Sequence, residues 1–230
     1  MTLPVHVARQ LWIQLRLLGL LVLPSAAAIV AVIIEGQAGS EAARLALGVG
    51  FAVAAVLSAA LVGTGFAEEI GSGAAAWLIV RAVPRNAVIG AWLGLPMAAI
   101  LFAYVLAGIL AGLAIPPSLA RTPDPLAIAV AVVASAAPAF ALSAASLAIA
   151  VHATGRITAV ATVGGAAILA VPLVLIGASA VHPASGFWLA AGIAPGNQPI
   201  TVGLEAIGLC LLLTAVIWVI AARRFGGRDL

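Results

Sequence analysis

Residues 17–34 read LLGLLVLPSAAAIVAVII, an apolar stretch that contains no charged side chain. As an α-helix this stretch is about 27 Å long, close to the roughly 30 Å thickness of the hydrocarbon core of a bilayer. The whole chain of 230 residues is 65% hydrophobic and 7% charged, whereas soluble domains are roughly half apolar and a quarter charged. The sequence therefore predicts an all-α membrane protein, organised as a single transmembrane domain over residues 1–230. Its six predicted membrane-spanning helices cover approximately 17–34, 45–66, 87–113, 126–151, 157–179 and 202–220.

The arginines predict how the spans are oriented. The chain has ten arginines and no lysine, and an even number of spans places eight of the ten on the side of the two termini. Because loops on the cytoplasmic side of a membrane carry an excess of Lys and Arg, we expect both termini to be cytoplasmic. The eight are Arg9, Arg16, Arg81, Arg85, Arg156, Arg223, Arg224 and Arg228, and the two on the opposite side are Arg44 and Arg121.

The same composition argues against several functions. A chain without lysine cannot form a P-loop, which needs a lysine on the nucleotide phosphates, so we expect no ATP-hydrolysing site in this chain. The arginines are scattered at the ends of apolar stretches, which is not the basic patch typical of a nucleic-acid-binding protein. His6, His152 and His182 stand at none of the spacings typical of metal ligands, so no metal site or cofactor is expected in this chain.

The loop after the second predicted span carries the most informative pattern. Residues 66–94 read FAEEIGSGAAAWLIVRAVPRNAVIGAWLG. Paired carboxylates precede Gly71, Ser72 and Gly73, which interrupt the helix, and Ser72 is a candidate cap for a new one. Residues 74–80 are expected to form a short apolar helix at the cytoplasmic surface, because they are too few to cross the bilayer. Its apolar face fits either the lipid headgroup boundary or a groove in a partner protein. The candidate site residues of this loop are Glu68, Glu69, Gly73, Trp77, Arg81 and Arg85.

This loop resembles the signature of the permease subunits of type-2 ABC exporters. In that family a glutamate at the end of span two precedes a glycine with a small residue, a hydrophobic helix, a proline, and a basic residue before span three. Two features differ, because Ala82 stands where the proline is usual, with Pro84 two residues later, and no arginine follows the first glutamate. The likeness covers essentially the whole chain, since the family also has six spans, both ends inside and an amphipathic lead-in helix. The matching positions in the loop are Glu69, Gly73, Ala74 to Val80, Val83 and Arg85.

The resemblance implies that the chain is the membrane half of an ATP-driven exporter in the plasma membrane of a bacterium. Two separate ATPase subunits, which bind ATP and Mg, would dock on the loop helix. A second permease chain, identical or different, would complete a translocation pathway for an apolar or amphipathic substrate, in contact with membrane lipid. Glu69 would either pair with an arginine of the ATPase or fix the end of span two, and Arg85 would pair in the same way.

Residues 5–16 show an amphipathic pattern, with Val5, Leu11, Trp12 and Leu15 on one side. This pattern has two interpretations. One is an amphipathic interfacial helix along the inner membrane surface, as in the resembling family. The other is an extension of the first span with a charged flank.

Glu205 is the one carboxylate inside a predicted span, about one turn from its outer end. A charge within a membrane is costly and is therefore a functional candidate. Glu205 would bind a cationic substrate, relay a proton, or serve structurally by pairing with Arg44 or Arg121. It is the basis of an alternative function, a proton-coupled secondary transporter. A membrane assembly factor without transport activity is a third hypothesis.

Overall fold

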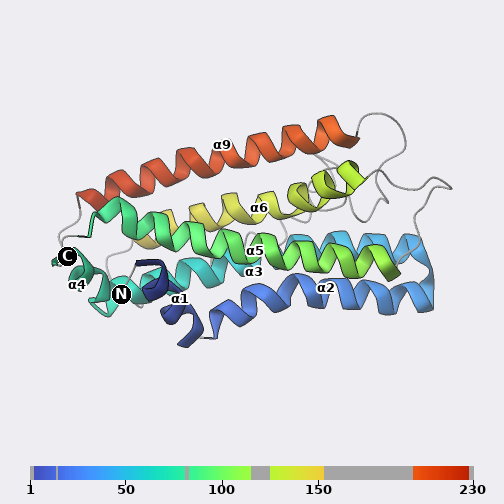
Figure 1. Ribbon diagram of the computed structural model, residues 1–230, viewed down its shortest axis with the longest axis horizontal. Helices are drawn as coiled ribbons and strands as arrows, with labels where there is room; N and C mark the ends of the chain where they lie inside the picture. Colours follow the sequence, from blue (N-terminus) through green and yellow to red (C-terminus); the bar gives the residue numbers. More distant parts are fainter. Residues whose placement is uncertain (1–2, 14, 81–82, 115–124, 153–198, 228–230) are drawn as a thin grey trace.

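The computed structural model describes residues 3–13, 15–80, 83–114, 125–152 and 199–227. Every regular element in this part of the chain is an α-helix (Figure 1). The helices are α1 (Leu3–Ile13), α2 (Arg16–Ala38), α3 (Ser40–Gly71), α4 (Ala74–Val80), α5 (Arg85–Ala114), α6 (Pro125–His152) and α9 (Pro199–Gly226).

Five of the described helices are long and apolar enough to cross a membrane. The prediction of an all-α chain with several candidate membrane-spanning helices is therefore confirmed, while the predicted span at 157–179 lies outside the described residues. The helices extend beyond the predicted spans, because polar residues at the aqueous ends continue the helix after the apolar stretch stops. The candidate spans cover Arg16–Ala38, Ala46–Gly71, Arg85–Ala111, Val132–His152 and Gly203–Gly226.

The long helices lie side by side along one axis, and Figure 1 shows their directions. Helices α2 and α5 run one way, and α3, α6 and α9 run the other way. The consecutive described spans α6 and α9 therefore point in the same direction. We use "the α4 end" for the end of the bundle that holds α1, α4, the start of α5 and the end of α9.

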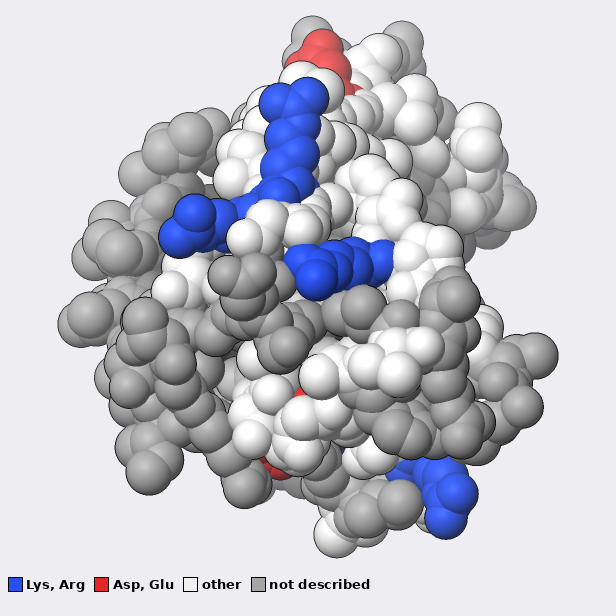
Figure 2. Space-filling model, turned by 90° about the vertical axis from the view of Figure 1, so that its left-hand side faces the viewer, with Lys and Arg blue, Asp and Glu red and all other residues white. Residues whose placement is uncertain are grey.

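The α4 end is rich in positive charge, and Figure 2, which looks onto it, shows several arginine side chains on its surface. In the described part of the chain, five arginines belong to the segments that meet there, whereas Arg44 belongs to the opposite end of α3. This is the asymmetry that the sequence predicted for the described arginines. The five are Arg9, Arg16, Arg85, Arg223 and Arg224.

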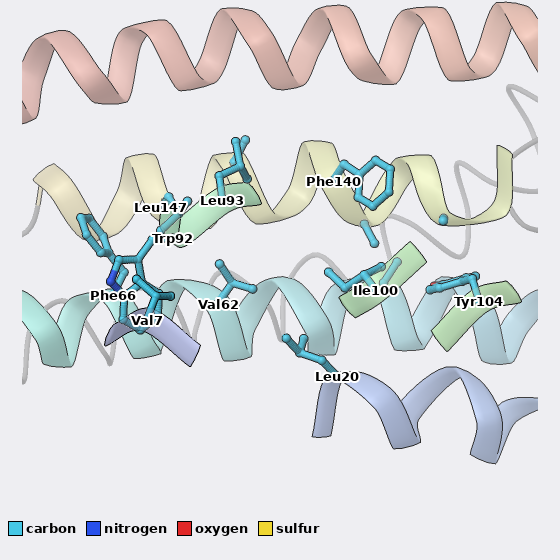
Figure 3. Packing of buried hydrophobic residues seen from close by; sticks show 14 of the residues in the cluster. Val7, Leu20, Val62, Phe66, Trp92, Leu93, Ile100, Tyr104, Phe140 and Leu147 are labelled. Carbon is cyan, nitrogen blue, oxygen red and sulfur yellow. The ribbon is translucent and has the colours of Figure 1, made fainter. Parts of the chain in front are cut away.

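Buried apolar side chains from all seven described helices form one continuous core (Figure 3). Nearer the end of the bundle opposite to α4, the Tyr104 hydroxyl donates a hydrogen bond to the Phe51 carbonyl at 2.7 Å, and the two rings lie 4.9 Å apart (Figure 3). At the α4 end, Phe66 lies 5.8 Å from Trp92 and 5.7 Å from Phe225, ring centre to ring centre. This aromatic cluster joins α3, α5 and α9.

Two glycines permit close contact between helices. A Cβ built on Gly50 of α3 would lie 2.6 Å from the Ala27 Cβ of α2, and one on Gly203 of α9 would lie 2.5 Å from the Val130 Cγ1 of α6. Small residues at such crossings let membrane helices approach closely, since apolar burial alone does not drive their association in lipid.

Candidate functional site at the α4 end

The turn between α3 and α4 is built from Ser72 and Gly73. Gly73 has a φ of +76°, a left-handed conformation that favours glycine. The Ser72 backbone N–H donates to Glu68 O at 2.9 Å, and its hydroxyl donates to Glu69 O at 3.1 Å. The prediction that Ser72 caps the new helix was therefore wrong, because its hydroxyl instead satisfies a carbonyl at the end of α3.

The short helix expected after this turn is present as α4, with the predicted bounds Ala74–Val80. It contacts α3 and α5. Ala75 and Leu78 are buried against the core, while Val80 is 85% exposed. The helix thus has an inner apolar side, which fixes it to the bundle, and an apolar residue exposed at its end. The side chain of Trp77 and all of Arg81 lie outside the described part of the chain.

Glu68 is held by an arginine from the start of α2. One terminal nitrogen of Arg16 (Nη2) lies 2.7 Å from Glu68 Oε1, and the other (Nη1) donates to Leu61 O at 2.8 Å and to the Thr64 hydroxyl. The side chains of Arg16 and Glu68 are 11% and 23% exposed. The first carboxylate of the pair is therefore occupied within the chain and ties α3 to α2.

Glu69 is held by α1. Its carboxylate oxygen Oε1 accepts a hydrogen bond from His6 Nε2 at 2.8 Å, and its side chain is only 3% exposed. A carboxylate that is buried to this extent needs such a partner, because an unpaired buried charge is costly. Of the two roles predicted for Glu69, this contact fits the second, fixing the end of the span.

Arg85 begins α5 and reaches across to the last turn of α9. Its Nη1 donates to Gly226 O at 2.7 Å and to Phe225 O at 3.4 Å. The last carbonyls of a helix lack partners within the helix, so a guanidinium at this position satisfies them and complements the negative end of the helix dipole. The segment from α3 through α4 to α5 is thus fixed on one flank by α1 and α2 and on the other by α9.

The partners His6 and Arg16 were not among the predicted site residues. The signal for them was electrostatic. Paired carboxylates at the end of an apolar span need cations nearby, and Arg16 was predicted on the same side of the membrane as Glu68 and Glu69. Spacing along the chain cannot identify such partners, because Glu69 and His6 are 63 residues apart.

Helix α1 is a separate helix and not an extension of the first span. Leu15, between α1 and α2, has a φ of +55°, and this left-handed residue ends the continuity of the two helices. Val7 of α1 is fully buried, whereas Val5 and Trp12 are 54% and 62% exposed. The predicted apolar side of α1 therefore faces outward, and a different residue connects it to the core.

Glu205 lies far from this site. It is exposed near the start of α9, at the end of the bundle opposite to α4. The structure therefore brings together Glu68, Glu69 and Arg85 at one end, and leaves Glu205 apart. No group of three or more His, Cys, Asp or Glu side chains among the described residues is arranged to hold a metal ion.

The Arg16–Glu68 pair gives a testable prediction. Arg16→Gln and Glu68→Gln should each lower the free energy of unfolding by about 2 kcal/mol, because each leaves half-buried charged hydrogen bonds unmade. The double variant should cost less than the sum of the two by about 1 kcal/mol, since the side chains contact each other. Reversible denaturant unfolding in detergent micelles measures these differences. Arg9→Gln, at an exposed arginine, is the control and should change little. Strictly additive effects would show that the contact between Arg16 and Glu68 contributes no interaction energy to stability.

The chain matches no protein-family model and no curated protein with which it was compared.

Proposed function

We propose that this chain is the transmembrane permease subunit of an ATP-driven exporter of the type-2 ABC class. The observation that carries the proposal is α4, a seven-residue apolar helix between two candidate spans at the arginine-rich end of the bundle. In this proposal α4 is the coupling helix that docks on a separate ATPase subunit. Glu68, Glu69 and Arg85 hold the segments on either side of it in place.

A docking helix transmits movement only if it is joined rigidly to the spans. Helix α4 meets this requirement, because its inner residues Ala75 and Leu78 are buried in the core. The carboxylates before it are paired, and Arg85 after it is bonded to α9. Displacement of α4 by a closing ATPase would therefore move α3 and α5 together, and would reach α9 through the Arg85 contact.

The internal pairing also changes which residues would contact the ATPase. Glu69 is buried and engaged with His6, so its side chain is poorly placed to bind a partner. The contact surface would instead consist of the outward side of α4, including exposed Val80. Trp77 is the proposed aromatic anchor, because aromatic side chains dominate the binding energy of interfaces.

The proposed topology has six spans with both termini in the cytoplasm. Two observations support it. The arginines of the described residues gather at the α4 end, as expected of a cytoplasmic side. Helices α6 and α9 point in the same direction, which suits one additional crossing between them.

Compartment-reporting tags fused at residues 1 and 230 should therefore both report the cytoplasm. A tag in the predicted outer loop, residues 115–125, should report the opposite side. Termini on opposite sides of the membrane would exclude the six-span topology.

The assembled exporter would contain two ATPase subunits, which bind ATP and Mg, and a second permease chain, identical or different. This chain itself would supply the pathway and the coupling but not the hydrolysis. The proposed location is a bacterial plasma membrane, and the proposed substrate is an apolar or amphipathic molecule. Glu205 gives the secondary-transporter alternative little support, because it faces away from the core of this chain.

The experiment that tests the function is co-purification of the chain with its partners from native membranes, followed by measurement of ATP hydrolysis in the reconstituted complex. We expect a bound ATPase whose stimulated activity falls about tenfold or more with Trp77→Ala, because loss of an aromatic anchor typically costs about 2 kcal/mol of binding. Trp12→Ala is the matched control, since Trp12 is exposed on another helix at the same end. An active preparation that never binds an ATPase, or unchanged stimulation with Trp77→Ala, would refute the proposal.

A further inference from the structure

Helix α9 is the most exposed of the candidate spans in the described part of the chain. Only 11% of its apolar window is buried, against 28–61% for the other four. It packs on α6 and α5 through one side, which includes buried Thr214, Ala221 and Phe225. The opposite side is an apolar stripe of exposed residues, which we call the α9 stripe. It consists of Leu209, Leu212, Val216, Val219 and Ile220.

Two arginines continue the α9 stripe at the α4 end. Arg223 follows Val216 by seven residues and Ile220 by three, so it lies on the same side of the helix. Arg224 follows Ile220 by four residues and lies beside it. Both arginines are exposed and form no hydrogen bond or ion pair among the described residues. This differs from Arg16 and Arg85, which are engaged within the chain.

The negative charge at the carboxyl end of α9 is also offset within the chain, which favours binding of an anion there. The carboxyl end of a helix is negative and would repel a phosphate. In this chain the carbonyls of Phe225 and Gly226 accept hydrogen bonds from Arg85. The guanidinium offsets that negative charge, so Arg223 and Arg224 present a net positive surface next to the apolar stripe.

We propose that this surface binds an anionic phospholipid. The headgroup phosphate is held by Arg223 and Arg224, because guanidinium groups bind phosphate through charge-assisted hydrogen bonds. The acyl chain lies along the α9 stripe. Basic residues at the cytoplasmic ends of spans attract anionic lipid in this way. The inference does not depend on whether the chain couples to an ATPase.

A second copy of the chain fits the stripe less well. Glu205 lies eleven residues before Val216, close to three helical turns, and therefore on the same side of α9. In a two-fold symmetric dimer within a membrane, both copies have the same orientation. Glu205 would then face Glu205 and Arg223 would face Arg223, which is unfavourable in a medium of low dielectric constant. A lipid that carries its negative charge at the arginine end alone avoids both repulsions.

The test uses the full chain in nanodiscs of equal parts phosphatidylglycerol and phosphatidylcholine, with the retained lipids counted by native mass spectrometry. We expect retention of phosphatidylglycerol over phosphatidylcholine. Arg223→Gln with Arg224→Gln should lower this preference about thirtyfold, which corresponds to about 1 kcal/mol for each arginine. Lysine at both positions should preserve most of it. Arg9→Gln is the matched control, since Arg9 is an exposed arginine at the same end.

Several results would overturn the proposal. An unchanged preference in the double glutamine variant would remove the two arginines from the site. An equal loss with Arg9→Gln would indicate diffuse attraction to the whole surface. Displacement of the lipid by soluble glycerol phosphate would indicate a free-phosphate site with no role for the stripe. Efficient disulfide cross-linking between copies of a Leu212→Cys, Cys210→Ala variant would indicate that a second chain covers it.

Discussion

Replacing Trp92 with alanine is expected to lower the free energy of unfolding by about 3 kcal/mol or more, the typical cost of truncating a large core aromatic residue. Trp92 is fully buried and its ring packs against Phe66. The would-be Cβ of Gly65 lies 2.9 Å from Trp92 Cζ3, so the ring rests directly on the α3 backbone. The cavity left behind would therefore lie between α3 and α5, where rigid helices cannot easily close it.

Denaturant unfolding in detergent micelles measures this loss, and Trp12→Ala is the matched control. Trp12 is 62% exposed, so its removal should change the free energy of unfolding by less than about 0.5 kcal/mol. Equal losses for the two tryptophans would contradict the buried position of Trp92. Trp92→Phe separates the contribution of ring packing from that of the indole N–H. The Trp92 Nε1 is buried with no hydrogen-bond partner among the described residues. Phenylalanine removes that unpaired donor, so its cost should be much smaller than that of alanine.

The second large effect is expected for Gly50→Ala, which should lower the free energy of unfolding by about 1–3 kcal/mol. The new Cβ would lie 2.6 Å from the Ala27 Cβ and 3.3 Å from the Ala27 Cα. Neither atom belongs to a flexible side chain, so α2 and α3 would have to separate. The loss would come from close contact along the whole crossing of the two helices, which small residues make possible.

Gly94→Ala is the control for this substitution. Gly94 lies on α5, is exposed, and would have nothing within 4 Å of a new Cβ. Alanine there should be neutral or stabilising by up to about 1 kcal/mol, because glycine is a poor helix former. The same unfolding assay measures both variants. The distance between spin labels on α2 and α3 should increase with Gly50→Ala and stay the same with Gly94→Ala. Similar effects at Gly50 and Gly94 would contradict the close crossing.

The lengths of the apolar stretches, and the glycines and prolines between them, predicted much of the helical layout. Span positions follow from hydrophobicity, because a helix in lipid must be apolar over its whole length. The bounds of α4 follow from the glycines before it and the proline after it. The span predicted at 45–66 is shorter than α3, because Glu68 and Glu69 are polar and yet continue the helix to Gly71. Carboxylates are compatible with a helix wherever a cation satisfies them.

Side-chain partners were less predictable. Glu68, Glu69 and Arg85 were identified from the loop, but the residues that hold them come from α1, α2 and α9. These contacts depend on which helices are neighbours, and apolar composition alone does not specify this order in a bundle of similar spans. The sequence predicted one apolar side of α1, but not that Val7, outside that side, would connect the helix to the core. Only the position of α3 and α5 decides that Val7 turns inward and Trp12 outward.

The aromatic cluster at the α4 end has a consequence for biosynthesis. Val7, Phe66 and Trp92 lie close together in one core, although they come from three different helices, α1, α3 and α5 (Figure 3). Val7 leaves the ribosome long before Trp92, and α1 packs on α2 and α5, so α1 must wait at the membrane surface until α5 has been inserted. Its exposed Val5 and Trp12 suit that waiting position. A nascent chain that stops before α5 therefore leaves its first helix without the partner that covers Val7.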